Sequence, residues 1–454
     1  MFVLEYKVYP KQYQIDAINE AIKTTQFVRN KVLRFWMDNR SVGKTEMFRY
    51  NTRLRKEYNF VTELNSHACQ TAVERTLRAI TRFYDNCKNK VKGKKGYPKF
   101  KHNSRSVEYK VSGWRLEETK KHITFTDKKG IGMLKLVGSR DINYFQPEQI
   151  KRVRILKRAD GFYVQFCIKL DPRDTIKPIE PSGKAVGLDV GLKYFLADSQ
   201  GNIEPNPRFY RKAEKRLNKL NRRKSKKFKK GKKQSNNYHK ARQRYACANL
   251  KVSRKREEFV KRVALRLVKS NDLLFCEDLS VKNMVRNAPP LSTADPAGFE
   301  IQQERGSAFH ALNSIQGGSA VKNRRLSKSI SDAGWFLFRR WLEYFADKYG
   351  KIAKAIPPHG TSQICSNCGQ KVEKTLSTRT HVCPHCNYVE DRDINAGKNI
   401  LQKGLSRLGR SQTYASGEIP SWLVGEILLA NGNSSNEESP RRDSRGERQN
   451  QKKS

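Results

Sequence analysis

The stretch Cys365-Ser-Asn-Cys368, followed after fourteen residues by Cys383-Pro-His-Cys386, leads into Asp391-Arg-Asp393-Ile-Asn395-Ala396. Zinc prefers tetrahedral thiolate sites, and a Cys-x2-Cys turn places two sulfurs on one metal. Two such turns form a closed site without room for water, so we expect one structural Zn²⁺ bound by Cys365, Cys368, Cys383 and Cys386. The alternatives are a redox pair, which rarely comes doubled at this spacing, and a disulfide frame, which an intracellular chain disfavours.

The charge balance of the chain points to a polyanionic partner. Its 454 residues include 93 lysines and arginines against 44 acids, a formal net charge of +49. Such an excess repels itself in a compact fold unless a polyanion neutralises it, and nucleic acid fits better than an anionic membrane. Hydrophobic residues make up 37% of the chain, enough for real cores, so a disordered protein is excluded. We expect two or three domains.

Targeting signals are not evident in the sequence. No run of 18 apolar residues exists, and the first seven residues lack the apolar core of a signal peptide. Cys167 and Cys276 fall in apolar, strand-like runs that are typical of buried thiols. We therefore expect a cytoplasmic protein without a membrane partner.

Hydrophobic periodicity separates helical from strand-rich regions. Spacings of three to four predict helices between residues 12 and 90, and the first ten residues are a strand candidate. Two hairpins are expected, one across 122–136 and one across 153–168, and proline marks 172–181 as a linker. Further strands are expected in 184–198, 272–277 and 351–357, and helices in 206–270 and around Trp335 to Phe345. Residues 287–320 are expected to be a flexible insertion, and those after 431 disordered.

Three acids stand at the ends of predicted elements. Asp189 and Glu277 each end an apolar strand, and Asp393 opens a helix. Phosphodiester cleavage by two metal ions requires carboxylates that converge from separate elements. Each acid also has an ordinary explanation: Asp189 as a turn residue, Glu277 or Asp278 as a cap, and Asp391 or Asp393 as helix caps. Their joint occurrence with the cysteines favours a nuclease.

Five motifs in family order over residues 187–400 resemble the TnpB family of transposon-encoded RNA-guided DNA endonucleases, which is related to small type V CRISPR effectors. They are Gly187-Leu-Asp-Val-Gly191, Glu277-Asp-Leu-Ser-Val-Lys-Asn-Met284, Ser331-Asp-Ala-Gly-Trp335, Thr361-Ser-Gln-Ile-Cys-Ser-Asn-Cys-Gly369 and Asp391-Arg-Asp-Ile-Asn-Ala396. Looser matches are Tyr9-Pro-Lys-Gln-Tyr13 and Gly96-Tyr-Pro-Lys-Phe-Lys101. Two departures are the insertion at 287–321 and Gly397, where the family often has alanine.

The resemblance implies a multidomain chain of α/β and β class. It predicts an RNase H-like RuvC core with an inserted zinc ribbon, and an N-terminal β-barrel wedge domain with an inserted helical recognition lobe. The implied boundaries are 1–10 and 95–180 for the wedge, 11–94 for the lobe, 181–360 for RuvC with a basic helical insertion at 206–270, 361–390 for the ribbon, 391–405 for the last catalytic helix and 406–454 for the tail.

The same resemblance assigns the catalytic acids to Asp189, Glu277 and Asp393, which would bind two Mg²⁺ ions. The motif position assigns the catalytic role to Asp393 and not to Asp391. Residues two apart on a helix point in different directions, so both acids are not expected to reach the same metal ions. The implied partners are a guide RNA from the transposon end and double- and single-stranded target DNA beside a short motif, in a prokaryotic cytoplasm and at the nucleoid when bound. The oligomeric state stays open.

The composition of the basic segment 206–270 supports a prediction that does not depend on the family resemblance. Between Arg211 and Lys233, 14 of 23 residues are lysine or arginine, against one acid, Glu214. Charge surrounds both helix faces, so we expect this segment to line a channel for an RNA–DNA hybrid; the alternative is a solvated helix pair. Candidate contacts are Arg211, Lys215, Arg222, Arg223, Lys226 and Lys227. Weaker candidates for base contacts, with helix capping as the alternative, are Asn65, Ser66 and Gln70.

The expected function is therefore cleavage of guide-matched DNA by two-metal-ion hydrolysis. One rival is a nuclease-inactive, RNA-guided DNA-binding repressor on the same scaffold, against which the three intact acids argue. The others are a transposase that acts on DNA without RNA and a zinc-ribbon RNA-binding protein.

Overall fold

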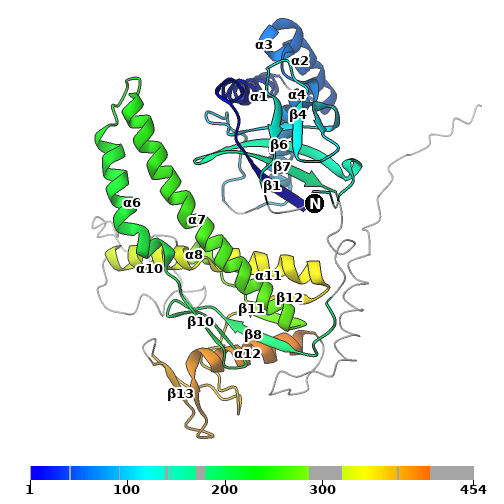
Figure 1. Ribbon diagram of the computed structural model, residues 1–454. Coiled ribbons are helices and arrows are strands. Elements are labelled where there is room, and N and C mark those ends of the chain that lie inside the picture. The colour runs from blue at the N-terminus through cyan, green and yellow to red at the C-terminus, as the bar shows by residue number, and fades with distance from the viewer. Residues whose placement is uncertain are drawn as a thin grey trace, which may run out of the picture. The chain divides into compact units, whose positions relative to one another are not determined.

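The computed structural model describes residues 2–39, 42–91, 93–138, 142–143, 145–169, 179–285, 320–375 and 378–408. The chain divides into two compact units, Met1–Thr175 and Ile176–Ser454 (Figure 1). Residues 287–319 of the expected insertion, the tail after 431 and most of the expected linker lie outside the described residues. No helix in the described ranges is both long and apolar enough to cross a membrane.

Helices and two sheets build the first unit. The helices occupy the region expected from periodicity, and α1 turns the face with Ile18, Val28 and Val32 into the core. The helices are α1 (Gln12–Asp38), α2 (Lys44–Glu57), α3 (Asn59–Thr62) and α4 (Ser66–Lys88), with 3₁₀ turns η1 (Val111–Gly113) and η2 (Pro147–Gln149). The strands are β1 (Phe2–Val8), β2 (Ser106–Tyr109), β3 (Trp114–Leu116), β4 (His122–Phe125), β5 (Gly132–Lys135), β6 (Ile150–Arg158) and β7 (Gly161–Ile168).

The strands of this unit do not close into the expected β-barrel. One sheet has the order β1-β7-β6-β2, and the other has the order β3-β4-β5. A barrel requires every edge strand to be paired, whereas β1 and β2 remain edges. Among the described residues, the single bridge Lys7↔Val137 joins the two sheets. The two predicted hairpins, β4–β5 and β6–β7, and the N-terminal strand β1 are confirmed.

The second unit is built on a mixed five-stranded sheet of order β10-β9-β8-β11-β12. Strand β11 runs parallel to both β8 and β12, while β9 is antiparallel to β8 and β10. These strands are β8 (Ala185–Asp189), β9 (Tyr194–Asp198), β10 (Ile203–Pro205), β11 (Leu273–Glu277) and β12 (Ile352–Ile356). The helices are α6 (Phe209–Lys226), α7 (Asn236–Ser270), α8 (Val281–Met284), α10 (Ala320–Ala333), α11 (Trp335–Tyr349) and α12 (Arg392–Arg407), and a small ribbon contains β13 (Thr380–Val382) and β14 (Val389–Asp391).

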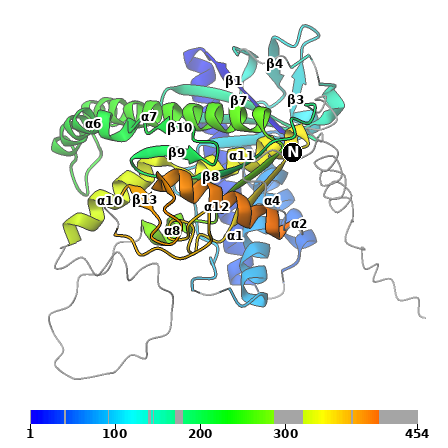
Figure 2. The same ribbon diagram turned by 90° about the horizontal axis from the view of Figure 1, so that it is seen from below.

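Helices cover both faces of this sheet. Val186 and Leu274 belong to a core shared with α7 and α11, whereas Ala185, Leu273 and Phe275 belong to a second core shared with α12. This division follows from the two-residue period of a strand. Figure 2 shows α12 crossing the sheet beside β8 and β9, which it contacts. Side chains at odd-numbered positions of β8 and β11 therefore face α12.

Candidate active site and cysteine cluster

Asp189 and Glu277 lie side by side where two parallel strands end. The register pairs Leu188 of β8 with Cys276 of β11, so the next residues are the two acids. Both positions are odd-numbered and therefore belong to the sheet face covered by α12. Each acid keeps partial exposure, so the site is open to solvent.

Helix α12 reaches this face because glycines allow it to approach closely. A Cβ atom on Gly187 would lie 2.0 Å from the carbonyl oxygen of Gly397, and a Cβ atom on Gly397 would lie 2.9 Å from the backbone nitrogen of Ser199. Gly397 stands where the family often has alanine, and packing explains the glycine: the methyl group of an alanine would clash with the backbone at the end of β9. Asp393 stands four residues, or about 6 Å along the helix, before this contact.

The charges of Glu277 and Asp393 both act on Asp189. Desolvation raises the pKa of Asp189 well above its usual value, and the negative charges of Glu277 and Asp393 raise it further. The positive charge of Arg392 offsets part of this effect. Desolvation also raises the pKa of Glu277. Like charges gathered in this way resist ionisation, and a cation is the simplest way to compensate them.

Residues outside the predicted set hold these carboxylates. The Thr361 hydroxyl donates a hydrogen bond of 2.6 Å to Glu277 Oε1, and this bond opposes the rise in the pKa of Glu277. Two guanidinium nitrogens of Arg392 lie 3.1 Å from Asp393 Oδ1. Both residues lie in motifs quoted from the sequence, but nothing local in the sequence indicates their partners.

Asp391 acts as a helix cap. Its carboxylate accepts a hydrogen bond of 2.8 Å from the backbone N–H of Asp393, the N-cap arrangement that satisfies a free donor in the first turn. Asp393 is buried, with 9% exposure, and interacts with Asp189. Asp391 thus caps the helix, whereas the charge of Asp393 acts on Asp189.

The carboxylates of Asp189, Glu277 and Asp393 are spaced more widely than the ligands of a site for one metal ion. Among the described residues, only the four cysteines place the ligand atoms of three or more His, Cys, Asp or Glu residues within 4.8 Å of one another. Two ions about 4 Å apart require a wider arrangement, because each carboxylate needs to reach only one ion or bridge both. Asp189, Glu277 and Asp393 offer hard oxygen donors, the ligands that Mg²⁺ prefers.

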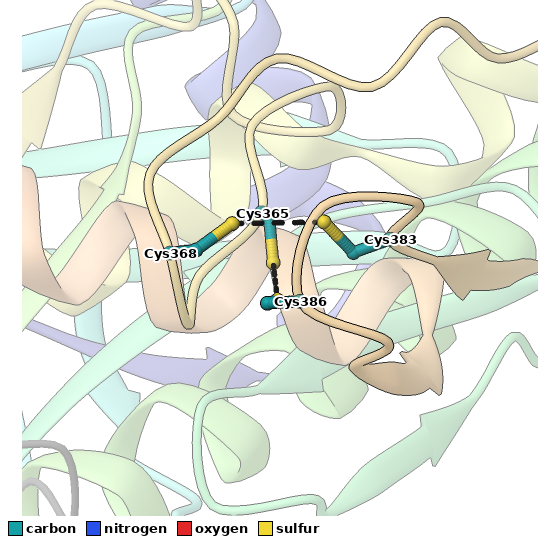
Figure 3. Close-up of side chains that lie close together, drawn as sticks. All are labelled: Cys365, Cys368, Cys383 and Cys386. Carbon is teal, nitrogen blue, oxygen red and sulfur yellow. Dashed lines mark hydrogen bonds between the residues drawn. The ribbon is translucent and has the colours of Figure 1, made fainter.

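The four cysteines meet as the spacing predicted (Figure 3). Cys365 Sγ lies 3.7 Å from Cys386 Sγ, and Cys368 Sγ lies 3.6 Å from Cys383 Sγ. A disulfide would require about 2.05 Å, whereas the edge of a zinc–thiolate tetrahedron with 2.3 Å bonds is about 3.8 Å. The cluster therefore fits a structural zinc site.

Two matching turns present these sulfurs. In the first, the Gly369 N–H donates to the Cys365 carbonyl at 2.9 Å, and in the second the Asn387 N–H donates to the Cys383 carbonyl at the same distance. Gly369 and Asn387 both have positive φ, which glycine and asparagine tolerate best. The Asn367 amide donates to Cys386 Sγ and lowers the pKa of that thiol to about 6, which favours the thiolate form.

Histidines near the cluster are not needed as ligands. His359 and His385 are exposed. His381 is fully buried and contacts Lys374. The alternation of β13 turns this residue inward beside Tyr388.

The basic helices α6 and α7 form an antiparallel pair (Figure 1). A groove runs between them. The groove has a volume of about 880 Å³, and its walls carry Lys212, Arg216, Lys240, Arg244, Lys251 and Lys255. Five of the six candidate contacts, Lys215, Arg222, Arg223, Lys226 and Lys227, are exposed. Arg211 instead contacts Glu214, Ser329 and the Arg325 carbonyl, which ties α6 to α10.

The weak candidates at the second helix behave mainly as the alternative suggested. Asn65 is the N-cap of α4 and accepts from the His67 N–H at 2.9 Å, while its amide donates to Thr126. Ser66 is exposed and Gln70 half-buried, and both lie in the first turns of that helix. Capping accounts for Asn65 without any base contact.

Comparisons with known proteins find similarity to one family. Residues 335–400 match the family described as "Cas12f1-like, TNB domain", and residues 165–288 match the one described as "Probable transposase". A candidate RNA-guided DNA endonuclease of Streptomyces pristinaespiralis is 26% identical over 419 residues, covering 88% of this chain and 89% of its own length. The chain is similar to proteins of the TnpB family.

Two further relatives align over shorter stretches. The candidate RNA-guided DNA endonuclease InsQ of Escherichia coli (strain K12) is 26% identical over 347 residues, 76% of this chain and 77% of its own. TnpB-like protein L79 of Acanthamoeba polyphaga mimivirus is 22% identical over 250 residues, 54% of this chain and 41% of its own.

Solved structures align less closely. The Cas12f1–sgRNA–target DNA complex has a TM-score of 0.31 at 14% identity, covering 88% of this chain and 98% of that one. The mini-RNA-guided endonuclease CRISPR-Cas_phi3 has a TM-score of 0.33 at 14% identity, covering 74% and 66%. At these scores the superpositions do not define a shared fold.

Proposed function

We propose that this chain is an RNA-guided DNA endonuclease that hydrolyses a phosphodiester bond at Asp189, Glu277 and Asp393. The observation that supports the proposal is the adjacent ending of β8 and β11 at Asp189 and Glu277, where the charges of Glu277 and Asp393 raise the cost of ionising Asp189. Relatives named as candidate RNA-guided DNA endonucleases support the same activity. The sheet with helices on both faces agrees with a RuvC-type core.

The three acids would hold a pair of Mg²⁺ ions. When bound, such ions activate water and stabilise the leaving oxygen of an in-line displacement. Thr361 fixes one oxygen of Glu277, and Arg392 fixes one oxygen of Asp393, so each carboxylate is oriented before substrate arrives. Arg392 also limits the repulsion between Asp393 and Asp189. Glycine-mediated packing of α12 on β8 sets the position of Asp393.

Specificity would come from base pairing between a guide RNA and the target strand. The exposed lysines and arginines of α6 would contact the backbone of the hybrid without reading its sequence. The first unit would act as wedge and recognition lobe and read a short adjacent DNA motif. The four-cysteine ribbon would hold the segment from Thr361 to Ser366 against α12.

The test begins with the RNA that co-purifies with the protein. That RNA is sequenced, and a plasmid carrying its variable end beside randomised flanks is incubated with the complex and Mg²⁺. We expect cuts only in plasmids matched to the RNA, and none with Asp189→Asn or after RNase treatment of the complex. Guide-matched binding without a cut would support the repressor, and cutting without RNA would support a transposase.

A further inference from the structure

A cavity in the first unit gathers positive charge and has no acid among its lining residues. It has a volume of about 600 Å³ and lies between α1, α4 and the segment 96–106. Seven of its fourteen lining residues are lysine or arginine, and none is aspartate or glutamate. A concave site with this charge attracts an anion more strongly than a flat surface does.

The wall of the cavity is built by hydrogen bonds to the backbone. Asn30 of α1 exchanges two bonds with Lys101, one of 2.8 Å to its carbonyl and one of 2.9 Å from its N–H. Gln26 accepts from the Ser104 N–H at 2.7 Å. These contacts fix the backbone of the segment, while the side chains of Lys99 and Lys101 stay exposed.

Arg29 and Arg75 are the two inner cations. Arg75 shares a carboxylate, because Glu108 also pairs with Arg152 and Arg154. Arg29 donates to the Lys99 carbonyl at 3.3 Å and has no carboxylate partner within the described residues. Burial lowers the pKa of Arg29, and the positive charge of Arg75 lowers it further. The fold thus holds a partly buried cation whose counter-ion it does not provide.

An aromatic surface adjoins the cavity. Tyr97 lines it with 51% of its area exposed. The Trp36 ring lies 5.9 Å from the Tyr97 ring, and the Phe83 ring meets it edge-on at 5.2 Å. A braced, exposed ring beside a phosphate-sized cluster of cations suits a nucleotide whose base is unpaired, because stacking requires a free base face.

From this arrangement we propose that the cavity binds a backbone phosphate of single-stranded nucleic acid, with Arg29 and Arg75 at the phosphate and Tyr97 under the neighbouring base. This contact is separate from the nuclease acids and from the basic helices α6 and α7. It shares with the proposed function only the premise that the chain binds nucleic acid, and it does not depend on cleavage.

The test compares Arg29→Gln with Arg34→Gln in the full-length, zinc-loaded protein. Arg34 lies on the same helix but pairs with Asp38 at 2.8 Å and does not line the cavity. Affinity is measured with labelled oligouridine and with oligothymidine of equal length. We expect R29Q to lose roughly tenfold in affinity, as for one charged hydrogen-bond contact, and to reduce the salt slope by about 0.7. R34Q should stay within about twofold of wild type, as for an exposed pair.

Two further measurements, thermal melting and acetylation footprinting, show whether a loss of affinity arises at the cavity. Because Arg29 lacks an acidic partner and is repelled by Arg75, R29Q should melt no earlier than wild type; if it fails to fold, the exposed Lys101→Gln takes its place. Acetylation footprinting should show Lys99 and Lys101 protected by the oligonucleotide. Equal losses on both probes assign the contact to phosphate alone, and a loss on one assigns it to RNA or to DNA.

Affinities of R29Q and K101Q equal to that of R34Q, with Lys99 and Lys101 labelled equally with and without probe, would overturn the proposal. Probe binding is measured without any cleavage step. The cavity can therefore be confirmed even if the chain proves unable to cut DNA, and a nuclease can be confirmed even if the cavity binds nothing.

Discussion

At the residue scale, Asp189 ends an apolar strand beside two further carboxylates, and its pKa is raised first by desolvation and then by Glu277 and Asp393. A raised pKa means that the contribution of Asp189 to stability is complete below its unfolded pKa of about 3.9 and is lost as pH rises through the folded pKa. Asp189→Asn should therefore melt at a higher temperature than wild type in Mg²⁺-free buffer, and the gap should widen from acidic to neutral pH.

The same substitution should reduce cleavage by more than about 100-fold, because replacing even the supporting partners of metal ligands costs about 10- to 100-fold. Asp391→Asn is the matched control. It neutralises an acid two residues from Asp393, and asparagine is an equally good N-cap. Thermal melts and Mg²⁺-dependent plasmid cleavage check both variants. A D189N protein that cuts normally, or that melts below wild type at neutral pH, would contradict the assignment.

The sequence allowed the acids to be located but not the side chains that orient them. Asp189 and Glu277 each end an apolar run of strand length, and β8 and β11 confirm that pattern. Thr361 touches Glu277 across 84 positions of sequence. A threonine in a loop carries no local signal of such a contact, because long-range hydrogen bonds depend on how elements pack.

At the element scale, Glu108 joins strands and helix in the first unit. Its side chain is 1% exposed and pairs with Arg75 of α4 and with Arg152 and Arg154 of β6. Burial raises its pKa, but Arg75 and the hydrogen bonds from Arg152 and Arg154 outweigh burial and lower it to about 2. The carboxylate therefore stabilises the fold above about pH 4.3 and loses this effect as pH falls toward 2.

We expect Glu108→Gln to destabilise the first unit by about 3–5 kcal/mol at neutral pH, because three arginines lose their shared anion. The cost should shrink as the solution becomes acidic. Glu20→Gln is the control, since Glu20 forms an exposed pair with Lys23 that contributes about 1 kcal/mol at most. Denaturant unfolding across pH 3 to 7 measures both, and a neutral E108Q variant would show that the network contributes nothing.

Because α12 packs closely on β8, we expect that Gly187 cannot be replaced by a larger residue without loss of stability. A methyl group on Gly187 would lie 2.0 Å from the Gly397 carbonyl oxygen and 2.5 Å from the Leu401 nitrogen, so the helix backbone would have to move. Gly187→Ala should cost more than the usual ~1–3 kcal/mol of overpacking and displace Asp393, so that cleavage is lost with stability. At Gly43 an added methyl group meets nothing within 4 Å, and Gly43→Ala should cut DNA normally.

Elements were easier to predict than their pairing. Both hairpins follow from alternating residues around glycine-containing turns, and β4–β5 and β6–β7 confirm them. The barrel expectation failed because alternation defines which residues face a core, whereas closure depends on whether two edge strands meet. Strands β1 and β2 share one sheet without pairing to each other.

At the scale of the whole molecule, the cysteine ribbon is coupled to the acids through α12. Asn395 of α12 donates to the Ile364 carbonyl at 2.8 Å and accepts from the Ser366 N–H at 2.9 Å. Asn399 donates to the Thr361 carbonyl at 2.8 Å, and the Thr361 hydroxyl holds Glu277. A change at the cysteines can therefore reach Glu277 through backbone that the helix holds in place.

Cys383→Ser should release the zinc and reduce cleavage, although Cys383 belongs to the four-cysteine cluster and not to the three acids. Loss of one thiolate opens the four-sulfur site, the segment from Thr361 to Ser366 loosens, and Glu277 loses an oriented hydrogen bond. We expect zinc per chain to fall from one to near zero and cleavage to fall roughly 10- to 100-fold. Cys87→Ser, a cysteine of the first unit, should retain zinc and activity. A zinc-free C383S protein that cuts at the wild-type rate would show that the ribbon and the carboxylates are mechanically independent.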